Sequence, residues 1–145
     1  MSIRRFEDIE AWQLARELTR QVYQHTQKAP FFSDFGLKDQ IQRASSSIMQ
    51  NSAEGFDSES NPEFIRFLRY SKRSCSEVQS QLYVALDNTY ISEQEFESLY
   101  EFARRSRAAI RGFINYLKKH AEKSPTMLAN EDPGDYNNST VNPEP

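Results

Sequence analysis

Cysteine, glycine and long apolar runs are scarce in this sequence. Its 145 residues include one cysteine, Cys75, and this excludes an intrachain disulfide and a zinc site built from several cysteines. A lone cysteine is typical of a reducing compartment, so we expect a bacterial or cytosolic protein. No segment approaches the roughly 20 apolar residues that cross a bilayer, and we expect a cytoplasmic protein that is neither secreted nor embedded in a membrane.

The chain also has little net charge. Its formal charge is -3, with 27% charged and 37% hydrophobic residues, which is ordinary for a soluble domain and demands neither nucleic acid nor membrane. The charge is unevenly spread, because residues 121–145 contain five acidic residues and one basic residue, leaving 17 basic and 16 acidic residues before them. That segment is rich in Pro, Asn and Ser and poor in apolar residues. We therefore predict one folded domain over residues 1–120 and a disordered acidic tail over residues 121–145.

What the chain does contain is four stretches of helical periodicity, in which apolar and small residues recur at alternating spacings of three and four. The stretches cover residues 8–28, 37–55, 61–89 and 92–117. The predicted apolar stripes are, in chain order, Trp12, Ala15, Thr19, Val22 and Thr26; Leu37, Ile41, Ala44, Ile48 and Asn51; Phe64, Leu68, Ser71, Cys75, Val78, Leu82 and Ala85; and Phe96, Leu99, Ala103, Ser106, Ile110, Phe113 and Leu117. We predict Asp8 and Asn61 as N-terminal caps and Gly55 as a left-handed residue at a helix end. Ser92 and Glu95 stand at the spacing of a capping box, which marks the start of the last helix.

Four amphipathic helices with short connections predict an all-α fold, an antiparallel up-and-down four-helix bundle, because packing together is the simplest way to cover four apolar stripes. No strand pattern competes with this interpretation. Cys75 falls on the apolar stripe of the third helix, so we expect a small buried hydrophobe rather than a nucleophile.

The stretch "SSIMQNSAEGF" places polar residues where apolar ones are due. Asn51 follows Ile48 by three residues on the stripe of the second helix. In one interpretation Asn51 bonds a neighbouring helix and fixes its register while Glu54 faces solvent. In the other, Asn51, Glu54 and Gly55 form a polar corner at one end of the bundle that faces another subunit or a ligand.

Basic residues gather in the third and fourth helices, and two interpretations of them stay open. The residues are Arg66, Arg69, Lys72, Arg73, Arg104, Arg105, Arg107 and Arg111. Such charges neutralise phosphates with little regard to sequence, and Phe67 and Tyr70 beside them offer surfaces on which bases stack. Alternatively the bases are solvated or paired with acids, since the fourth helix has its acids first and its bases last, as the helix dipole favours.

The sequence gives little support to catalysis. A di-iron bundle needs Glu-x-x-His pairs, yet Val22 precedes His25 at that offset and Leu117 precedes His120, so we expect no metal and no cofactor. Arg20 and His25 have the Arg-x4-His spacing of some helical-bundle ribonucleases. Chance readily produces this spacing in a chain with 18 lysines and arginines, and we expect no enzymatic activity.

The chain has more aromatic residues than the four apolar stripes can bury. Those outside the stripes or in connections are Phe31, Phe32, Phe35, Phe56, Tyr70, Tyr83, Tyr90 and Tyr100. Leftover aromatic surface commonly marks an interface between subunits, so we predict a homo-oligomer. The alternative is that these rings cap the ends of the bundle or lie singly on its surface.

Four segments together resemble the 23S rRNA-intervening sequence proteins, also called four helix bundle proteins. They are "DIEAWQLARELTRQVY", "LKDQIQRASSSIMQNSAEGF", "EFIRFLRYSKRSCSEVQSQLYVA" and "ISEQEFESLYE". The resemblance extends from about Phe6 to Lys119. It departs from the family pattern at Met49 and Ser52, where members usually have Pro and Ile.

The resemblance implies a small bacterial four-helix bundle that assembles into ring-like homopentamers. A distant relative is a pentameric bundle whose basic surface is understood to bind a reverse transcriptase and nucleic acid, although most members have no established biochemical activity. The resemblance thus favours a non-enzymatic oligomeric scaffold that binds RNA or a nucleoprotein partner. The alternative is a purely protein-binding scaffold without nucleic-acid contact.

Overall fold

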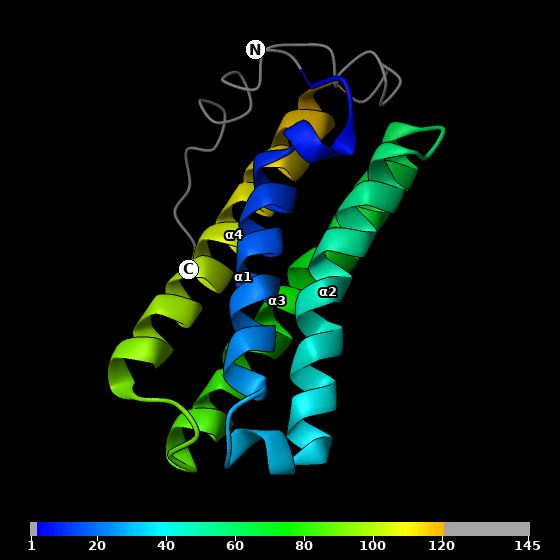
Figure 1. The fold of residues 1–145 in the computed structure, drawn as a ribbon. Helices are drawn as coiled ribbons and strands as arrows, with labels where there is room; N and C mark the ends of the chain where they lie inside the picture. The colour runs from blue at the N-terminus through cyan, green and yellow to red at the C-terminus, as the bar shows by residue number, and fades with distance from the viewer. Residues whose placement is uncertain (1–2, 121–145) are drawn as a thin grey trace.

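A computed structural model describes residues 3–120 of the chain and shows four long helices (Figure 1). They are α1 (Glu10–Thr26), α2 (Phe35–Phe56), α3 (Asn61–Asp87) and α4 (Glu93–Lys119), with the short 3-10 helices η1 (Phe6–Asp8) and η2 (Phe31–Ser33). The described part of the chain contains no strand, and successive helices run in opposite directions. This confirms the predicted all-α up-and-down bundle. The predicted disordered tail lies outside the described residues.

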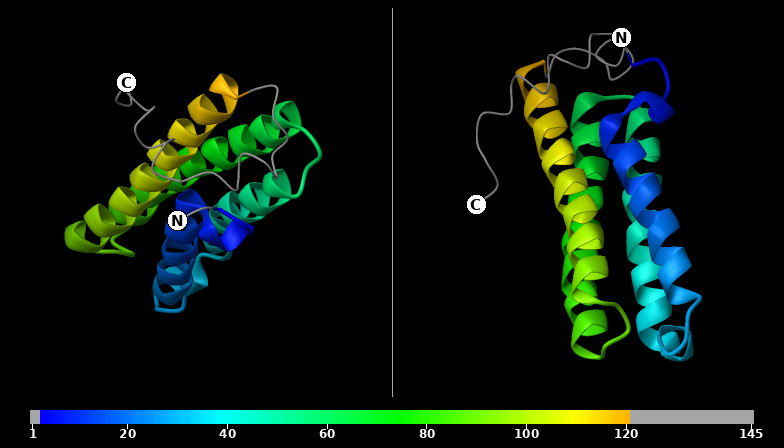
Figure 2. Two further views of the ribbon diagram at one scale, coloured as in Figure 1. Left: turned by 90° about the horizontal axis from the view of Figure 1, so that it is seen from above. Right: turned by 60° about the vertical axis from the view of Figure 1, so that its left-hand side comes forward.

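The four helices form a closed ring of neighbours. Helix α1 packs against α2 and α4, and α3 packs against the same two helices on the other side. Figure 2 shows α3 and α4 lying side by side along their lengths. Because the connections are short, each helix packs antiparallel to the previous one. In this arrangement the amphipathic helices bury their apolar faces against one another.

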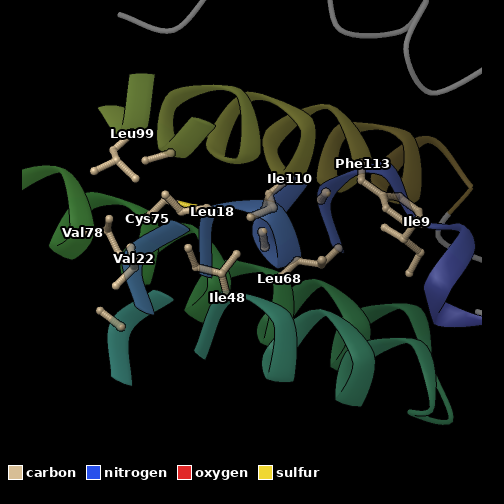
Figure 3. Close-up of a cluster of buried hydrophobic side chains, with 14 of the residues drawn as sticks. Ile9, Leu18, Val22, Ile48, Leu68, Cys75, Val78, Leu99, Ile110 and Phe113 are labelled. Atoms are coloured by element: carbon tan, nitrogen blue, oxygen red, sulfur yellow. The ribbon is translucent and has the colours of Figure 1, made fainter. Parts of the chain in front are cut away.

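The core runs along the middle of the bundle, with side chains from all four helices turned toward one another (Figure 3). Leu18, Ile48, Leu68 and Ile110 are each 0% exposed. Cys75 is also 0% exposed, as predicted, and burial raises the pKa of its thiol to about 12, so it is a buried hydrophobe and not a thiolate.

The apolar stripes predicted for α3 and α4 are confirmed almost throughout. All seven predicted positions of α3 are buried, and in α4 only the first, Phe96, is half-buried. In α1 the stripe is turned slightly from the prediction. Leu18 faces the core, whereas Trp12 and Thr19 are half-buried at its edge.

Two predicted N-terminal caps are wrong. Asp8 belongs to η1 and accepts a hydrogen bond from the backbone N–H of Arg4 at 3.1 Å, while α1 begins after Ile9 without a side-chain cap. Helix α3 is capped by Ser60, whose side chain accepts from the N–H of Glu63. The predicted capping box of α4 is confirmed, with both of its reciprocal hydrogen bonds present.

The prediction for Gly55 is also wrong, because α2 continues through it and no described glycine has a positive φ. A Cβ at Gly55 would lie 2.7 Å from Cδ1 of Phe64 and 3.0 Å from Cβ of Phe67. Cβ contacts below 3.0 Å essentially never occur, so glycine is needed here to let α2 approach α3. The left-handed residue is instead Thr89, after α3, with a φ of 58°.

Candidate nucleic-acid interface

The polar stretch of α2 lies against α3 and bonds to it through hydroxyl groups. Asn51 donates to the carbonyl of Ser47 at 3.0 Å and to its Oγ at 2.9 Å, within its own helix. Ser47 accepts in turn from Ser74 of α3 at 3.0 Å. The buried Ser52 lies 3.1 Å from the hydroxyl of Ser71 on α3. The polar residues therefore help to join the two helices, although Asn51 does so through Ser47 and not directly.

Asn51, Glu54 and Gly55 stand at positions i, i+3 and i+4 of α2, so they are neighbours on one side of that helix, and their role toward another subunit or a ligand stays a prediction. Asn51 is half-buried, Glu54 is exposed, and Gly55 is buried against Phe64. The three residues of the predicted polar corner thus lie in three different environments.

The basic residues do come together, in a groove between α3 and α4 with a volume of about 360 Å³. We call it the α3–α4 groove. It is lined by Arg69, Lys72, Arg107, Arg111, Ile114, Asn115 and Lys118. Four of these residues were among the predicted nucleic-acid contacts, and none of the described residues that line the groove is acidic.

Helical spacing explains which bases meet there. Arg107, Arg111 and Lys118 follow one another at intervals of four and seven residues, so they form one stripe along α4. Arg69 and Lys72, three residues apart, form the facing stripe of α3. Lys118 was missed because the prediction looked for bases adjacent in the sequence, whereas the helical interval from Arg111 would have found it.

The positive charges that line the groove act together on Lys72. Burial lowers the pKa of its ammonium group from the ordinary value, and the charges of Arg107, Arg111, Arg69 and Lys118 lower it further. All four of the other basic residues in the groove therefore act on one ammonium group. An anion in the groove would favour the charged form of Lys72, because an opposite charge offsets both effects.

Two more predicted bases, Arg66 and Arg73, lie around Tyr70 on α3. Arg66 forms an ion pair with Glu63 at 2.7 Å and donates to the hydroxyl of Tyr70 at 3.2 Å. The guanidinium carbon of Arg73 lies 5.6 Å from the centre of the Tyr70 ring. The ring of Tyr70, which was predicted to stack with bases, is thus already in contact with two arginines.

Arg104 and Arg105 lie outside the groove. Arg104 donates two hydrogen bonds to the carboxylate of Glu101, at 2.8 and 2.7 Å, which agrees with the salt-bridged interpretation. The guanidinium carbon of Arg105 lies 5.9 Å from the centre of the Phe102 ring. Both arginines line a separate cavity beside Glu10 of α1.

Arg20 and His25, which have the ribonuclease-like spacing, have different partners. Arg20 donates to Glu17 at 2.8 Å on the exposed side of α1. His25 lies 3.6 Å from Glu95 of α4, with its side chain 17% exposed. Among residues 3–120, no group of three His, Cys, Asp or Glu side chains could hold a metal ion.

The described helices also include none that is long and apolar enough to cross a membrane. The cytoplasmic location stays a prediction.

Fold and surface together define a small helical-bundle protein with a basic groove on one helix pair. The family model of the 23S rRNA-intervening sequence protein matches residues 7–112, and the chain belongs to this family. A similar crystal structure is that of a protein of unknown function from the S23 ribosomal protein family of Bacteroides thetaiotaomicron, with a TM-score of 0.66 and 21% identity over 72% of this chain and 97% of that one. At this identity the likeness shows the fold alone. No curated protein matches the chain.

Proposed function

We propose that this protein is a non-enzymatic oligomeric scaffold that binds RNA, alone or in a nucleoprotein partner, through the α3–α4 groove. The observation that carries the proposal is the groove itself. Two helices bring five basic side chains to one concave surface, and the described residues that line it include no acid. Arginine and lysine in such an arrangement neutralise backbone phosphates and release counterions, which supplies affinity without sequence specificity.

The length of the groove suits a run of phosphates. Arg107 and Lys118 are eleven residues apart on α4, which corresponds to about 16 Å along the helix axis. Phosphates follow one another at roughly 3.4 Å along one strand of a DNA duplex, so a stripe of this length is long enough for about five phosphates of a nucleic-acid strand. Asn115, between Arg111 and Lys118 on the same stripe, adds a neutral side chain that can donate a hydrogen bond to a phosphate or to a 2′-hydroxyl.

The test is a fluorescence anisotropy titration of a fluorescein-labelled RNA hairpin with the full chain. Arg69 and Lys118 are the residues to change, because both are exposed and their loss leaves the core intact. We expect Arg69→Gln/Lys118→Gln to weaken binding by about tenfold at low salt.

The matched control is Arg104→Gln/Arg105→Gln, which removes the same charge from the same helix pair outside the groove. We expect it to bind RNA nearly as well as the wild type. An equal loss of affinity in both variants would point to net charge rather than the groove. Absence of wild-type binding at low salt would contradict RNA binding altogether.

A purely protein-binding scaffold is the second candidate, and exposed apolar side chains favour it. Phe35 is 63% exposed, Tyr83 50%, Val84 44% and Phe32 43%. Large exposed apolar side chains are enriched at sites of association, and they also support the homo-oligomer, a pentamer by family resemblance. The molar mass from light scattering at micromolar concentration tests this, and a monomer mass would contradict the oligomer.

A further inference from the structure

The acidic end of the sequence begins next to the α3–α4 groove. Lys118 lines the groove, α4 ends at Lys119, and residues 121–145 follow immediately. The side chain of Asn61, at the start of α3, donates to the carbonyl of His120 at 2.6 Å. This bond holds His120, the last residue that the structure describes, against the start of α3, one of the two helices that form the groove.

We propose that the acidic segment 131–135 of this chain occupies the α3–α4 groove and competes there with RNA. The occupancy stands on the groove and the sequence, whereas the competition rests on the proposed function. Glu131, Asp132 and Asp135 place three carboxylates within five positions. Carboxylates and phosphates are bound by arginine in the same way, through short charge-assisted hydrogen bonds that are often paired.

The segment is long enough to reach every base in the groove. Glu131 follows Lys118 by thirteen residues, and an extended chain of that length spans up to about 43 Å, at roughly 3.3 Å per residue. The stripe from Lys118 back to Arg107 is only about 16 Å long. The reach of the intervening residues therefore exceeds the length of the groove.

Covalent attachment makes even a weak contact well populated. Attachment to the same chain holds the segment near the groove at an effective concentration on the order of millimolar. The three acids meet five bases in the groove, and salt weakens the contact because exposed charges are screened within about 8 Å at physiological ionic strength. RNA, with more charges, displaces the segment when its concentration is high enough.

The position of the segment is tested without RNA, by carbodiimide crosslinking of the full chain and mass spectrometry. This reagent joins a carboxylate and an amine that are in contact. We expect Glu131, Asp132 or Asp135 linked to Lys72, which is the diagnostic residue because tethering alone brings the segment near Lys118. Lys28, just after the end of α1, and Lys38, near the start of α2, are internal controls, because these two helix ends lie at the other end of the bundle from the end of α4 (Figure 1).

A second arm of the experiment measures competition. If the segment occupies the groove about four-fifths of the time, it raises the apparent Kd for RNA about fivefold. We expect Glu131→Gln/Asp132→Asn/Asp135→Asn to bind the RNA hairpin about fivefold more tightly than the wild type. The control Asp87→Asn/Glu93→Gln/Glu97→Gln removes the same charge at the far end of α3 and α4 and leaves the affinity nearly unchanged.

The two arms separate this inference from the proposed function. Crosslinks to Lys72 without RNA binding by any variant would support the occupancy and contradict RNA binding and competition. RNA binding that is unaffected by the acid substitutions, with Lys72 linked no more often than Lys28 and Lys38, would overturn the inference and leave the proposed function standing. Mixing isotope-labelled and unlabelled copies before crosslinking reveals links between chains, and links of that kind alone would overturn occupancy by the same chain.

Discussion

At the scale of single residues, small side chains decide how closely α2 and α3 approach. Ser52 and Ser71 both donate to the carbonyl of Ile48, at 2.9 Å each, and Gly55 lies directly against Phe64. Buried hydroxyls satisfied in this way cost little, because each finds a backbone acceptor at the helix contact. Larger residues at these positions would push the two helices apart.

Gly55→Ala should destabilise the protein although alanine is the better helix former. The added Cβ would meet the buried ring of Phe64 at 2.7 Å, and relieving such a clash costs about 1 to 3 kcal/mol. The gain in helix propensity is smaller, about 1 kcal/mol. Urea unfolding measures the net change, and we expect a lower free energy of unfolding.

Gly36→Ala is the matched control, because it makes the same substitution in the same helix at an open position. The nearest atom to its added Cβ is Oδ1 of Asp34, at 4.0 Å. We expect the free energy of unfolding to rise by about 0.5 to 1 kcal/mol. Equal effects at both glycines would contradict the close approach at Gly55.

At the scale of elements, the end of α3 is a Schellman motif with an unusual residue in it. The N–H of Tyr90 donates to the carbonyl of Ala85 and that of Thr89 to Leu86, both at 2.9 Å. Thr89 occupies the left-handed position with a φ of 58°, where glycine is the usual residue. A β-branched residue is strained in this region, because its side chain crowds the backbone.

Thr89→Gly should therefore stabilise the protein. We expect the free energy of unfolding to rise by about 0.5 to 1 kcal/mol, since relief of strain exceeds the entropy that glycine adds to the unfolded chain. Asn88→Gly, one residue earlier at a φ of -92°, relieves no strain and removes the side-chain hydrogen bond to Val84, so we expect it to destabilise. Thermal unfolding of both variants measures these changes in stability. A stabilising effect of Asn88→Gly would contradict the explanation by strain at Thr89.

The contact between α1 and α4 makes stability depend on pH. Burial lowers the pKa of His25 from its ordinary 6.5, although the nearby Glu95 opposes the shift and Lys28 adds to it. The unfolded chain then binds a proton more tightly than the folded one. As the pH falls through 6.5 toward the folded-state pKa, the free energy of unfolding must therefore decrease.

Replacing His25 by Gln should remove this part of the pH dependence. The wild type loses stability between pH 7 and the lowered pKa of His25, whereas the variant changes less over the same interval. Glu95 does not mask the effect, because its own pKa is lowered below 4.5 and its contribution disappears only at more acidic pH. Urea titrations at several pH values measure both proteins, and identical slopes would contradict the assignment to His25.

The existence of the helices was predictable from the sequence, but their ends were less so. Apolar periodicity is repeated many times in each helix, so single exceptions do not obscure it. A cap depends on one side chain, and Ser60 and Asn61 are both good capping residues at adjacent positions. In the structure Ser60 caps α3 and the side chain of Asn61 donates instead to the carbonyl of His120, a tertiary contact that local sequence patterns do not reveal.

At the scale of the whole molecule, the candidate site is a property of two helices and not of one. The sequence predicted a basic face on each of the two helices. Antiparallel packing brings only four of the predicted bases to the groove, together with Lys118; the four are Arg69, Lys72, Arg107 and Arg111. Arg66 and Arg104 differ from these four in having an acid three residues earlier in the sequence, a difference that the prediction did not use. Glu63 forms an ion pair with Arg66 within α3, and Glu101 forms one with Arg104 within α4.

The exposed apolar side chains that support the proposed oligomer lie on a different part of the surface from the groove. The exposed apolar side chains Phe32 and Phe35 lie around the start of α2, whereas Lys118 of the groove lies near the end of α4 (Figure 1). These two helix ends are at opposite ends of the bundle. Association through the apolar end would therefore leave the basic groove open to RNA.

The most direct test of RNA binding in the groove is the salt dependence of affinity for an RNA hairpin. The logarithm of the binding constant is plotted against the logarithm of salt concentration for the wild type and for Arg69→Gln/Lys118→Gln. If both side chains bind phosphates in the groove, the magnitude of the slope falls by about two, roughly one for each positive charge removed from a phosphate. Equal slopes for the two proteins would show that these residues release no counterions on binding, and would contradict the groove as the RNA-binding surface.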